Sequence, residues 1–242
     1  MDTLSPTVGF LDETGTGEDE TDFVNPDLPQ LHRMWRNEKY APELLPFNVR
    51  VVQNISEVVE YVGEDLDQDR QDEDQDPNDP SYVLRCKDLE RVKYVLRDYL
   101  RIRLWKLQKY PQHYLESKNL KLLSDAERTF LREHWHHKKQ FFESRMLSAL
   151  PPSKQSLDDK IDLLDMVRRP CLDKYTYARI LEDVGDLEVP SASLTQEPSQ
   201  GSRRDSFQKG RTYLVHYGVI RPFLIEPEHA GENQTYPKVD LV

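Results

Sequence analysis

The sequence lacks the features that identify membrane and secreted proteins. No run approaches about eighteen consecutive apolar residues, so we expect no membrane-spanning helix. The first residues, MDTLSPTVGFLDETG, contain neither a basic nor an apolar region, and secretion is not expected. The 242 residues include two cysteines, Cys86 and Cys171, which are far apart. They are typical of reduced thiols in a cytosolic or nuclear protein.

Signatures of enzymatic chemistry are lacking as well. No glycine-flanked serine and no cysteine–histidine pair has the spacing of a nucleophile and its base. The acidic residues cluster in polar runs, where nothing desolvates them enough to shift a pKa toward catalysis. Thr14-Gly15-Thr16-Gly17 follows no strand and lacks a lysine, so it is not a phosphate-binding loop. We therefore expect no catalytic residue, no cofactor and no enzymatic activity.

One histidine cluster, His134-Trp135-His136-His137, suggests a metal site. However, only His134 and His137 share a helical face, the HExxH pattern is missing, and neither cysteine is placed to complete a tetrahedral set. We expect a solvated helix face without a metal.

The charge of the chain is divided unevenly. The composition is 37% hydrophobic and 32% charged, with a mean hydropathy of −0.78 and a net charge of −11. Residues 1–27 carry eight acids and no base, and residues 64–79 carry nine acids and one base. The rest of the chain has 27 acids and 32 bases. The sequence therefore indicates a mildly basic folded body with two acidic flexible segments.

The longest predicted element is a helix over 81–110. Its apolar residues recur at spacings of three and four, which a strand cannot produce. They are Val83, Leu89, Val92, Leu96, Tyr99 and Trp105, widened by Leu100, Leu104 and Leu107. Nine basic residues occupy the remaining positions and require acids or phosphates as partners.

Three further helices are predicted. Asp27 is a candidate cap for the first, which ends before Pro42. A second, from about Pro46, keeps a helical repeat through Val62 although its β-branched residues favour a strand. Ser124-Asp125-Ala126-Glu127 is a capping box that opens the last helix, with Leu131, Trp135, Phe142 and Met146 facing inward.

The pattern changes from Pro170 onward. Strand-like runs cover 175–189, and RTYLVHYGVI alternates Tyr213, Val215, Tyr217 and Val219 on one face. A last strand covers 239–242, and a short amphipathic segment lies near 161–166. The sequence thus predicts a mainly α protein with a small β module: an acidic disordered tail over 1–26, a helical bundle over 27–150 with an acidic loop over 64–80, a linker over 151–169, and a β-rich domain over 170–242 with a flexible loop over 190–208.

Two segments carry a family pattern. Residues 35–45, WRNEKYAPELL, match W-x-N-E-x-x-A-P-E-L-L, and residues 90–106 form a characteristic basic, aromatic helix. Both resemble the Sld-five family of GINS, the eukaryotic replication tetramer. The ending, 210–224 and then 239–242, is similar to the closing strands of that family.

The chain also departs from that family. The loops over 190–206 and 227–238 look longer than the usual turns. The acidic tail has no evident copy of the short acidic-hydrophobic motif by which some members bind a trimeric replisome hub.

The resemblance implies a helical A domain and a β-rich B domain in a nuclear 1:1:1:1 complex with three other GINS subunits, an obligate hetero-oligomer. It implies that GINS joins the Mcm two-to-seven hexamer and Cdc-forty-five to make the replicative helicase, for initiation and elongation of DNA replication. The subunit itself would be a non-catalytic scaffold that contacts DNA at most indirectly.

The residues expected in the core or at a subunit interface are mainly aromatic and leucine side chains. They are Trp35, Tyr94, Leu96, Tyr99, Leu100, Trp105, Tyr213, Tyr217 and Leu241. Ion pairs between helices or between subunits are expected at three arginines, Arg91, Arg101 and Arg103.

Two other interpretations stay open. A stand-alone helical nucleic-acid-binding regulator would use the nine basic residues of the central helix, although the neighbouring acidic loop would compete with phosphate. Arg203-Arg204-Asp205-Ser206 resembles a basophilic kinase site, which makes Ser206 a candidate for phosphorylation.

Overall fold

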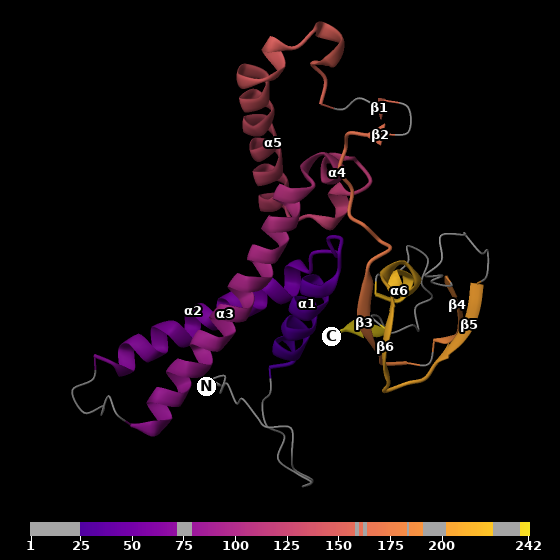
Figure 1. Ribbon diagram of the computed structural model, residues 1–242. Coiled ribbons are helices and arrows are strands. Elements are labelled where there is room, and N and C mark those ends of the chain that lie inside the picture. The colour runs from indigo at the N-terminus through magenta and orange to yellow at the C-terminus, as the bar shows by residue number, and fades with distance from the viewer. Residues whose placement is uncertain are drawn as a thin grey trace. The chain divides into compact units, whose positions relative to one another are not determined.

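The computed structural model describes residues 25–71, 79–157, 160–161, 164–182, 184–190, 202–224 and 238–242. The chain is mainly helical with small antiparallel sheets in its C-terminal part, as predicted (Figure 1). The longer helices are α1 (Asp27–Tyr40), α2 (Val49–Asp69), α3 (Pro80–Lys109) and α5 (Asp125–Arg145). The shorter ones are α4 (Pro111–Leu115) and α6 (Tyr217–Leu224), with 3-10 turns at Leu120–Leu122, Leu147–Ala149 and Pro152–Lys154. None of the described helices is both long and apolar enough to cross a membrane.

The chain divides into two compact units. Unit 1 comprises Met1–Trp35 and Asn48–Leu100, and unit 2 comprises Arg36–Phe47 and Arg101–Val242. Helices α1 and α3 contribute residues to both units. The domain boundaries predicted from the sequence, a helical domain over 27–150 and a β-rich domain over 170–242, stay predictions.

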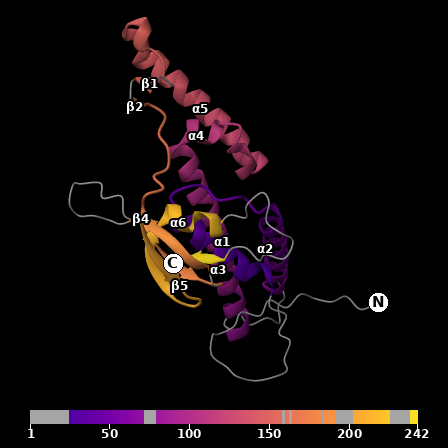
Figure 2. The same cartoon turned by 90° about the vertical axis from the view of Figure 1, so that its right-hand side faces the viewer.

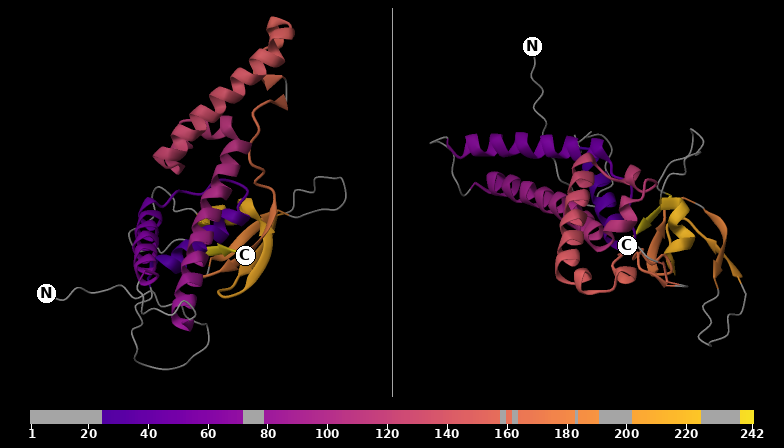
Figure 3. Two further views of the ribbon diagram at one scale, coloured as in Figure 1. Left: turned by 90° about the vertical axis from the view of Figure 1, so that its left-hand side faces the viewer. Right: turned by 90° about the horizontal axis from the view of Figure 1, so that it is seen from above.

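Unit 1 is built on an apolar seam where the first part of α3 runs beside α2 (Figure 3). Its buried core consists of Leu28, Leu31, Val51, Ile55, Val92 and Val95. On α3 the buried positions Val92, Val95 and Tyr99 follow the predicted three-and-four spacing. The prediction of Val83 in the buried stripe is wrong, because Val83 lies in the first turns of α3 and is 39% exposed.

The second helix confirms that periodicity outweighs β propensity here. Asn48 caps α2, with its side-chain oxygen accepting a hydrogen bond from the Val51 N–H at 3.2 Å. The predicted acidic loop over 64–80 is wrong in its first part, because α2 continues to Asp69. Arg85 of α3 pairs with both Asp65 and Asp69, which offsets the repulsion between the acids at the end of α2. The rest of that loop, 72–78, lies outside the described residues.

The first predicted cap was also misplaced. Asp27 lies inside α1, and its N–H donates to the Asn25 side chain at 3.0 Å. The Asp27 carboxylate instead accepts a hydrogen bond from the Asn54 side chain at 2.8 Å. Asn25 therefore takes the role predicted for Asp27.

The helical part of unit 2 is organised by the predicted capping box. Ser124 accepts from the Glu127 N–H at 3.2 Å, and the Glu127 carboxylate accepts from the Ser124 N–H at 2.9 Å. The helix that follows packs Leu131 into a core with Leu44, Leu107, Tyr114 and Leu123. The prediction that Met146 faces inward is wrong, since it is 56% exposed at the end of α5.

The β part of unit 2 contains three small antiparallel sheets among the described residues (Figure 2). The strands are β1 (Lys160–Ile161), β2 (Leu164–Asp165), β3 (Tyr175–Ile180), β4 (Gly185–Pro190), β5 (Ser202–Phe207), β6 (Thr212–His216) and β7 (Val239–Leu241). The sheet orders are β1-β2, β6-β3-β7 and β4-β5. In β3 the side chains of Thr176, Ala178 and Ile180 are buried and alternate with exposed ones, as a half-buried strand requires.

The predicted strand through RTYLVHYGVI is wrong in its second half, where α6 begins at Tyr217. The buried residues after His216 are Tyr217, Ile220 and Leu224, whose spacing fits a helix and not a strand. The N–H groups of Tyr217 and Gly218 donate to the carbonyls of residues that precede β3, at 2.9 and 3.1 Å. These contacts end the sheet pairing and start the helix.

Two polar segments also differ from the predictions. The predicted flexible loop over 190–208 contains strand β5, which pairs with β4 from Gly185↔Phe207 to Pro190↔Ser202. The predicted amphipathic segment near 161–166 is instead the β1–β2 pair. The rest of the loop, 191–201, most of the loop over 227–238 and nearly all of the predicted acidic tail over 1–26 lie outside the described residues.

Candidate functional site

The most unusual feature of unit 2 is a segment of charged and polar residues that lies inside the protein. Residues 36–47 follow the unit boundary in α1 and contain Asn37, Glu38 and Glu43, with exposed fractions of 5%, 1% and 7%. Burying a carboxylate is costly unless it is paired and hydrogen-bonded. The partners of these groups therefore show which elements the segment connects.

Arg103 is the centre of the network. Its side chain is 0% exposed, and its guanidinium makes a forked pair with Glu127, Nε to Oε1 at 2.7 Å and Nη2 to Oε2 at 3.0 Å. Nη1 donates to Glu38 Oε2 at 3.1 Å and to the Leu45 carbonyl at 2.7 Å, and Nη2 donates to the Leu122 carbonyl at 2.9 Å. The planar fork of arginine suits this arrangement because its N–H groups point in several fixed directions.

Lys106 completes the shell around Glu38. Its Nζ donates to Glu38 Oε1 at 2.6 Å, to the Glu38 carbonyl at 2.5 Å and to the Glu43 carbonyl at 2.7 Å. Burial lowers the pKa of Lys106 below its usual value, while the Glu38 carboxylate acts in the opposite direction. The ammonium thus holds both the side chain and the backbone of residues 38–43.

Glu43 extends the network into the β module. Its Oε1 accepts hydrogen bonds from the Tyr217 hydroxyl at 2.9 Å and from Arg221 Nε at 2.5 Å. Burial and the adjacent Glu43 raise the pKa of Tyr217, and the hydrogen bond to Glu43 raises the pKa of Arg221. Asn37 adds a second connection, because its side-chain oxygen accepts from the N–H of Leu241 in β7 at 2.8 Å. Residues 36–47 therefore join α3, α5, α6 and β7 within unit 2.

Apolar contacts follow the same segment. Leu44 is fully buried in the core below α5, and its N–H donates to the hydroxyl of Tyr114 at 2.8 Å. Ala41 and Leu45 pack on the other side, against the core of the β module. The segment is therefore held by two separate cores as well as by charges.

Most residues of this buried network are not among those that the sequence predicts for ion pairs or for the core. The sequence predicts Glu127 only as part of a capping box, and it predicts no separate role for Glu38, Glu43 or Lys106. A usable signal was present, because Arg103 and Lys106 continue the spacing of the buried positions that end at Tyr99. A basic residue in register with an apolar stripe is buried only when acids meet it, and the sequence alone does not show where those acids lie.

The predicted core residues have different positions. Tyr99, Tyr217 and Leu241 are buried, and Leu96 and Leu100 are half-buried. Trp35 is half-buried, and its indole N–H donates to Asp98 at 2.7 Å. Tyr213 is half-buried and packs edge-on against the ring of Phe207.

Tyr94 and Trp105 are 60% and 57% exposed, so their placement in the core of this chain is wrong. They lie on the side of α3 away from its buried positions. Their role at a subunit interface stays a prediction.

The three arginines predicted to form ion pairs differ in their burial. Arg103 is buried in the ion pairs described above, whereas Arg91 and Arg101 are exposed on α3. Their inter-subunit pairing stays a prediction. Ser206 is exposed in β5, in register with Asp186 of β4, and not in a loop as predicted. Its phosphorylation stays a prediction.

No group of three metal-binding side chains that could hold an ion occurs in the part of the chain that the structure describes. Each ionisable group of the network is in contact with another protein group, which is the arrangement of a structural centre. The fold and this site define a helical protein with a β module attached through a buried charged segment.

Comparison with known proteins agrees with this class. The family model of the GINS complex protein helical bundle domain, Sld5, matches residues 58–146. The chain is similar to the DNA replication complex GINS protein SLD5 of Mus musculus, with 31% identity over 206 residues, which cover 81% of this chain and 85% of the mouse protein. It is also similar to the proteins of the same name in Arabidopsis thaliana and Schizosaccharomyces pombe. The Arabidopsis thaliana protein is 32% identical over 214 residues, which cover 86% of this chain and 91% of that protein. The Schizosaccharomyces pombe protein is 32% identical over 209 residues, which cover 84% of this chain and 91% of that protein. The chain belongs to the SLD5 family of GINS proteins.

Proposed function

We propose that this chain is a non-catalytic scaffold subunit of a nuclear GINS complex and assembles with three other GINS subunits. Through that complex it would join the Mcm hexamer and Cdc-forty-five in the replicative helicase. The family membership supports the role in DNA replication. The buried network supports a structural role for residues 36–47 in unit 2, because Glu38, Arg103 and Lys106 are paired with protein groups and are less than 5% exposed.

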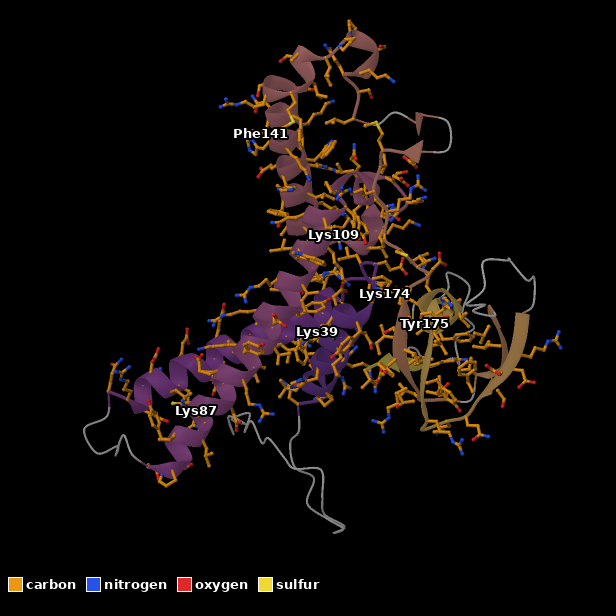
Figure 4. The ribbon with its side chains drawn as sticks, in the orientation of Figure 1. Lys39, Lys87, Lys109, Phe141, Lys174 and Tyr175 are labelled. Carbon is orange, nitrogen blue, oxygen red and sulfur yellow. The ribbon has the colours of Figure 1, made fainter. Side chains whose placement is uncertain are left out.

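The observation that carries the assembly proposal is the exposure of large apolar side chains on the long helices. In unit 1, Tyr94 of α3 is 60% exposed. In unit 2, Trp105 of α3 is 57% exposed, and Phe141 and Met146 of α5 are each 56% exposed. Figure 4 labels Phe141 on α5. Exposed aromatic residues on an ordered helix are typical anchors of protein interfaces, and obligate interfaces often bury more than about 2,000 Å².

The test is co-expression followed by size exclusion. The chain expressed alone should aggregate, and it should become soluble and elute as one complex when the three other subunits are present. Trp105→Ser and Phe141→Ser should each reduce the fraction that elutes in the complex. Arg132→Ser is the matched control, because Arg132 is an exposed polar residue of the same helix as Phe141. A monodisperse monomer at micromolar concentration, unchanged by the other subunits, would contradict the proposal.

A second candidate, direct nucleic-acid binding, is favoured by the exposed bases Arg91 and Arg97, three residues before and after Tyr94 in the part of α3 that belongs to unit 1. It predicts that the isolated chain binds duplex DNA with an affinity that falls steeply with salt. Fluorescence anisotropy with a labelled duplex at two salt concentrations separates the candidates. The scaffold proposal predicts no salt-sensitive binding by this chain.

A further inference from the structure

A concave surface in unit 2, which we call the α5 groove, is separate from the buried network. It has a volume of about 340 Å³ and is lined by residues from the end of α3, from α4 and from α5, together with Leu157, Met166 and Arg168. Its apolar lining comes from Tyr110, Trp135, Phe142, Leu157 and Met166. Trp135 and Phe142 lie two turns apart on one face of α5, so the groove follows the helix axis.

The walls of the groove are held in place by contacts within unit 2. The Gln112 side chain donates to the Leu157 carbonyl at 3.3 Å, which connects α4 to the far wall. Pro111, which also lines the groove, is buried, and Tyr110 packs against the core that contains Leu131 of α5. The groove is therefore formed before any partner arrives, which reduces the entropic cost of binding.

The charged side chains among the described residues that line the groove are all cationic. Lys109, Lys138 and Arg168 line the groove, and no acidic residue does so in the described part of the chain. None of the three cations forms an ion pair with a described residue. Lys109, labelled in Figure 4, has its Nζ 4.6 Å from the centroid of the Trp105 ring and 5.2 Å from that of Tyr110, so the two rings restrain its ammonium. A groove lined by apolar side chains and three cations is complementary to an apolar side chain flanked by carboxylates.

We propose that the α5 groove binds a short acidic peptide segment of a protein outside the GINS tetramer, with an aromatic or leucine side chain inserted against Trp135. This proposal rests on the proposed function, because it takes the chain to be one subunit of a GINS tetramer. A volume of about 340 Å³ accommodates one or two side chains, which a linear segment presents and a flat subunit face does not. The three cations then contact the carboxylates on either side of the inserted residue.

The chemistry favours a peptide over single-stranded nucleic acid. Leu157 and Met166 supply aliphatic surface, whereas nucleobases bind best between aromatic planes and along a continuous series of cations. Binding of single-stranded nucleic acid in the groove would therefore overturn the proposal.

The test uses fluorescence anisotropy on the co-expressed complex with a fluorescein-labelled synthetic peptide, EDFEDLE. The peptide should bind, while EDAEDAE, which lacks the apolar side chains, and KKFKKLK, which has the opposite charge, should bind at least about tenfold more weakly. Lys138→Glu should weaken EDFEDLE binding by about fivefold or more. Lys139→Glu is the matched control, because Lys139 is exposed next to Lys138 but does not line the groove, and it should change binding by less than about twofold.

Several results would overturn the proposal. They are the absence of EDFEDLE binding to the assembled complex, equal binding of EDFEDLE and EDAEDAE, equal effects of the two lysine variants, or displacement of the peptide by oligodeoxythymidine. Assembly is scored separately by size exclusion. If the complex does not form, the proposed function fails, and the same titration on the full chain then decides whether the groove binds the peptide.

Discussion

Replacement of Arg103 by methionine tests whether the buried network holds unit 2 together. Methionine has a similar length and fills the space, but it provides no donor. The substitution removes five hydrogen bonds, two of them to Glu127 and one to Glu38. Both carboxylates are less than 10% exposed, so water does not replace the lost partner.

The expected loss of stability depends on the partners that Glu38 and Glu127 keep after the substitution. After the change, Glu38 still has the Lys106 ammonium at 2.6 Å, and Glu127 still accepts from the Ser124 N–H at 2.9 Å. The lost guanidinium charge leaves an excess of buried negative charge. Breaking a buried pair by removing one partner costs about 3 to 5 kcal/mol. The same replacement at the exposed Arg101 should cost no more than about 0.5 kcal/mol.

The assay is hydrogen–deuterium exchange on the co-expressed complex, read in peptides that cover residues 36–47. The N–H groups of Leu44 and Leu45 donate to the Tyr114 hydroxyl and to Glu38, so they report opening of the segment directly. Because about 1.4 kcal/mol corresponds to a factor of ten, Arg103→Met should accelerate exchange there by about a hundredfold or more. Arg101→Met is the control that matches it in chemistry and in helix.

Equal exchange in the Arg103→Met and Arg101→Met proteins, within about threefold, would refute the reasoning. Arg103→Lys refines the result, because lysine keeps the charge but not the fork. It should be intermediate, with a loss of about 1 to 3 kcal/mol.

Three further predictions concern single contacts of unit 2. The pKa of Tyr217 is raised by burial, so its contribution to stability is complete below about pH 10 and is lost as the pH rises. The wild-type unfolding free energy, from urea midpoints of the co-expressed complex, should therefore fall with pH above about 10, and Tyr217→Phe should reduce that slope by up to about 1.4 kcal/mol per pH unit; an unchanged slope would contradict the assignment. Ser124→Ala should lower the unfolding free energy by about 1 kcal/mol through loss of the capping box, and exposed Ser148→Ala should not; similar urea midpoints for the two variants would argue against the cap. Asn37→Ala leaves the Leu241 N–H without its acceptor at a cost of about 1 to 3 kcal/mol, so exchange over 238–242 should accelerate, and protection equal to wild type would show that the contact is dispensable.

Local features of the sequence were sufficient to predict the four longer helices, α1, α2, α3 and α5, but not α4 and α6. The spacing of Val92 and Tyr99, the Ser124 capping box and Pro42 act within one or two turns of chain, so they determine where helices form and stop. Even the β-branched stretch of α2 was assigned correctly, because a repeat kept over several turns is stronger evidence than individual propensities.

Local patterns failed where distant residues decide the outcome. The alternation in RTYLVHYGVI fits a strand, yet Tyr217 begins a helix because its hydroxyl and N–H meet Glu43 and the Lys174 carbonyl. β5 was predicted as a loop because its polar residues show no apolar repeat, and its partner β4 lies well before it in the chain. Backbone pairing depends on the neighbouring strand and leaves little trace in a short polar sequence.

The helical class, the family resemblance and the distribution of acids and bases can be read from residues that are close together along the chain. The burial of Arg103 and Lys106 and the exposure of Tyr94 and Trp105 could be seen only in the folded chain. Burying a cation is favourable only where carboxylates converge on it, and Glu38 and Glu127 reach Arg103 from positions 65 and 24 residues away in the chain.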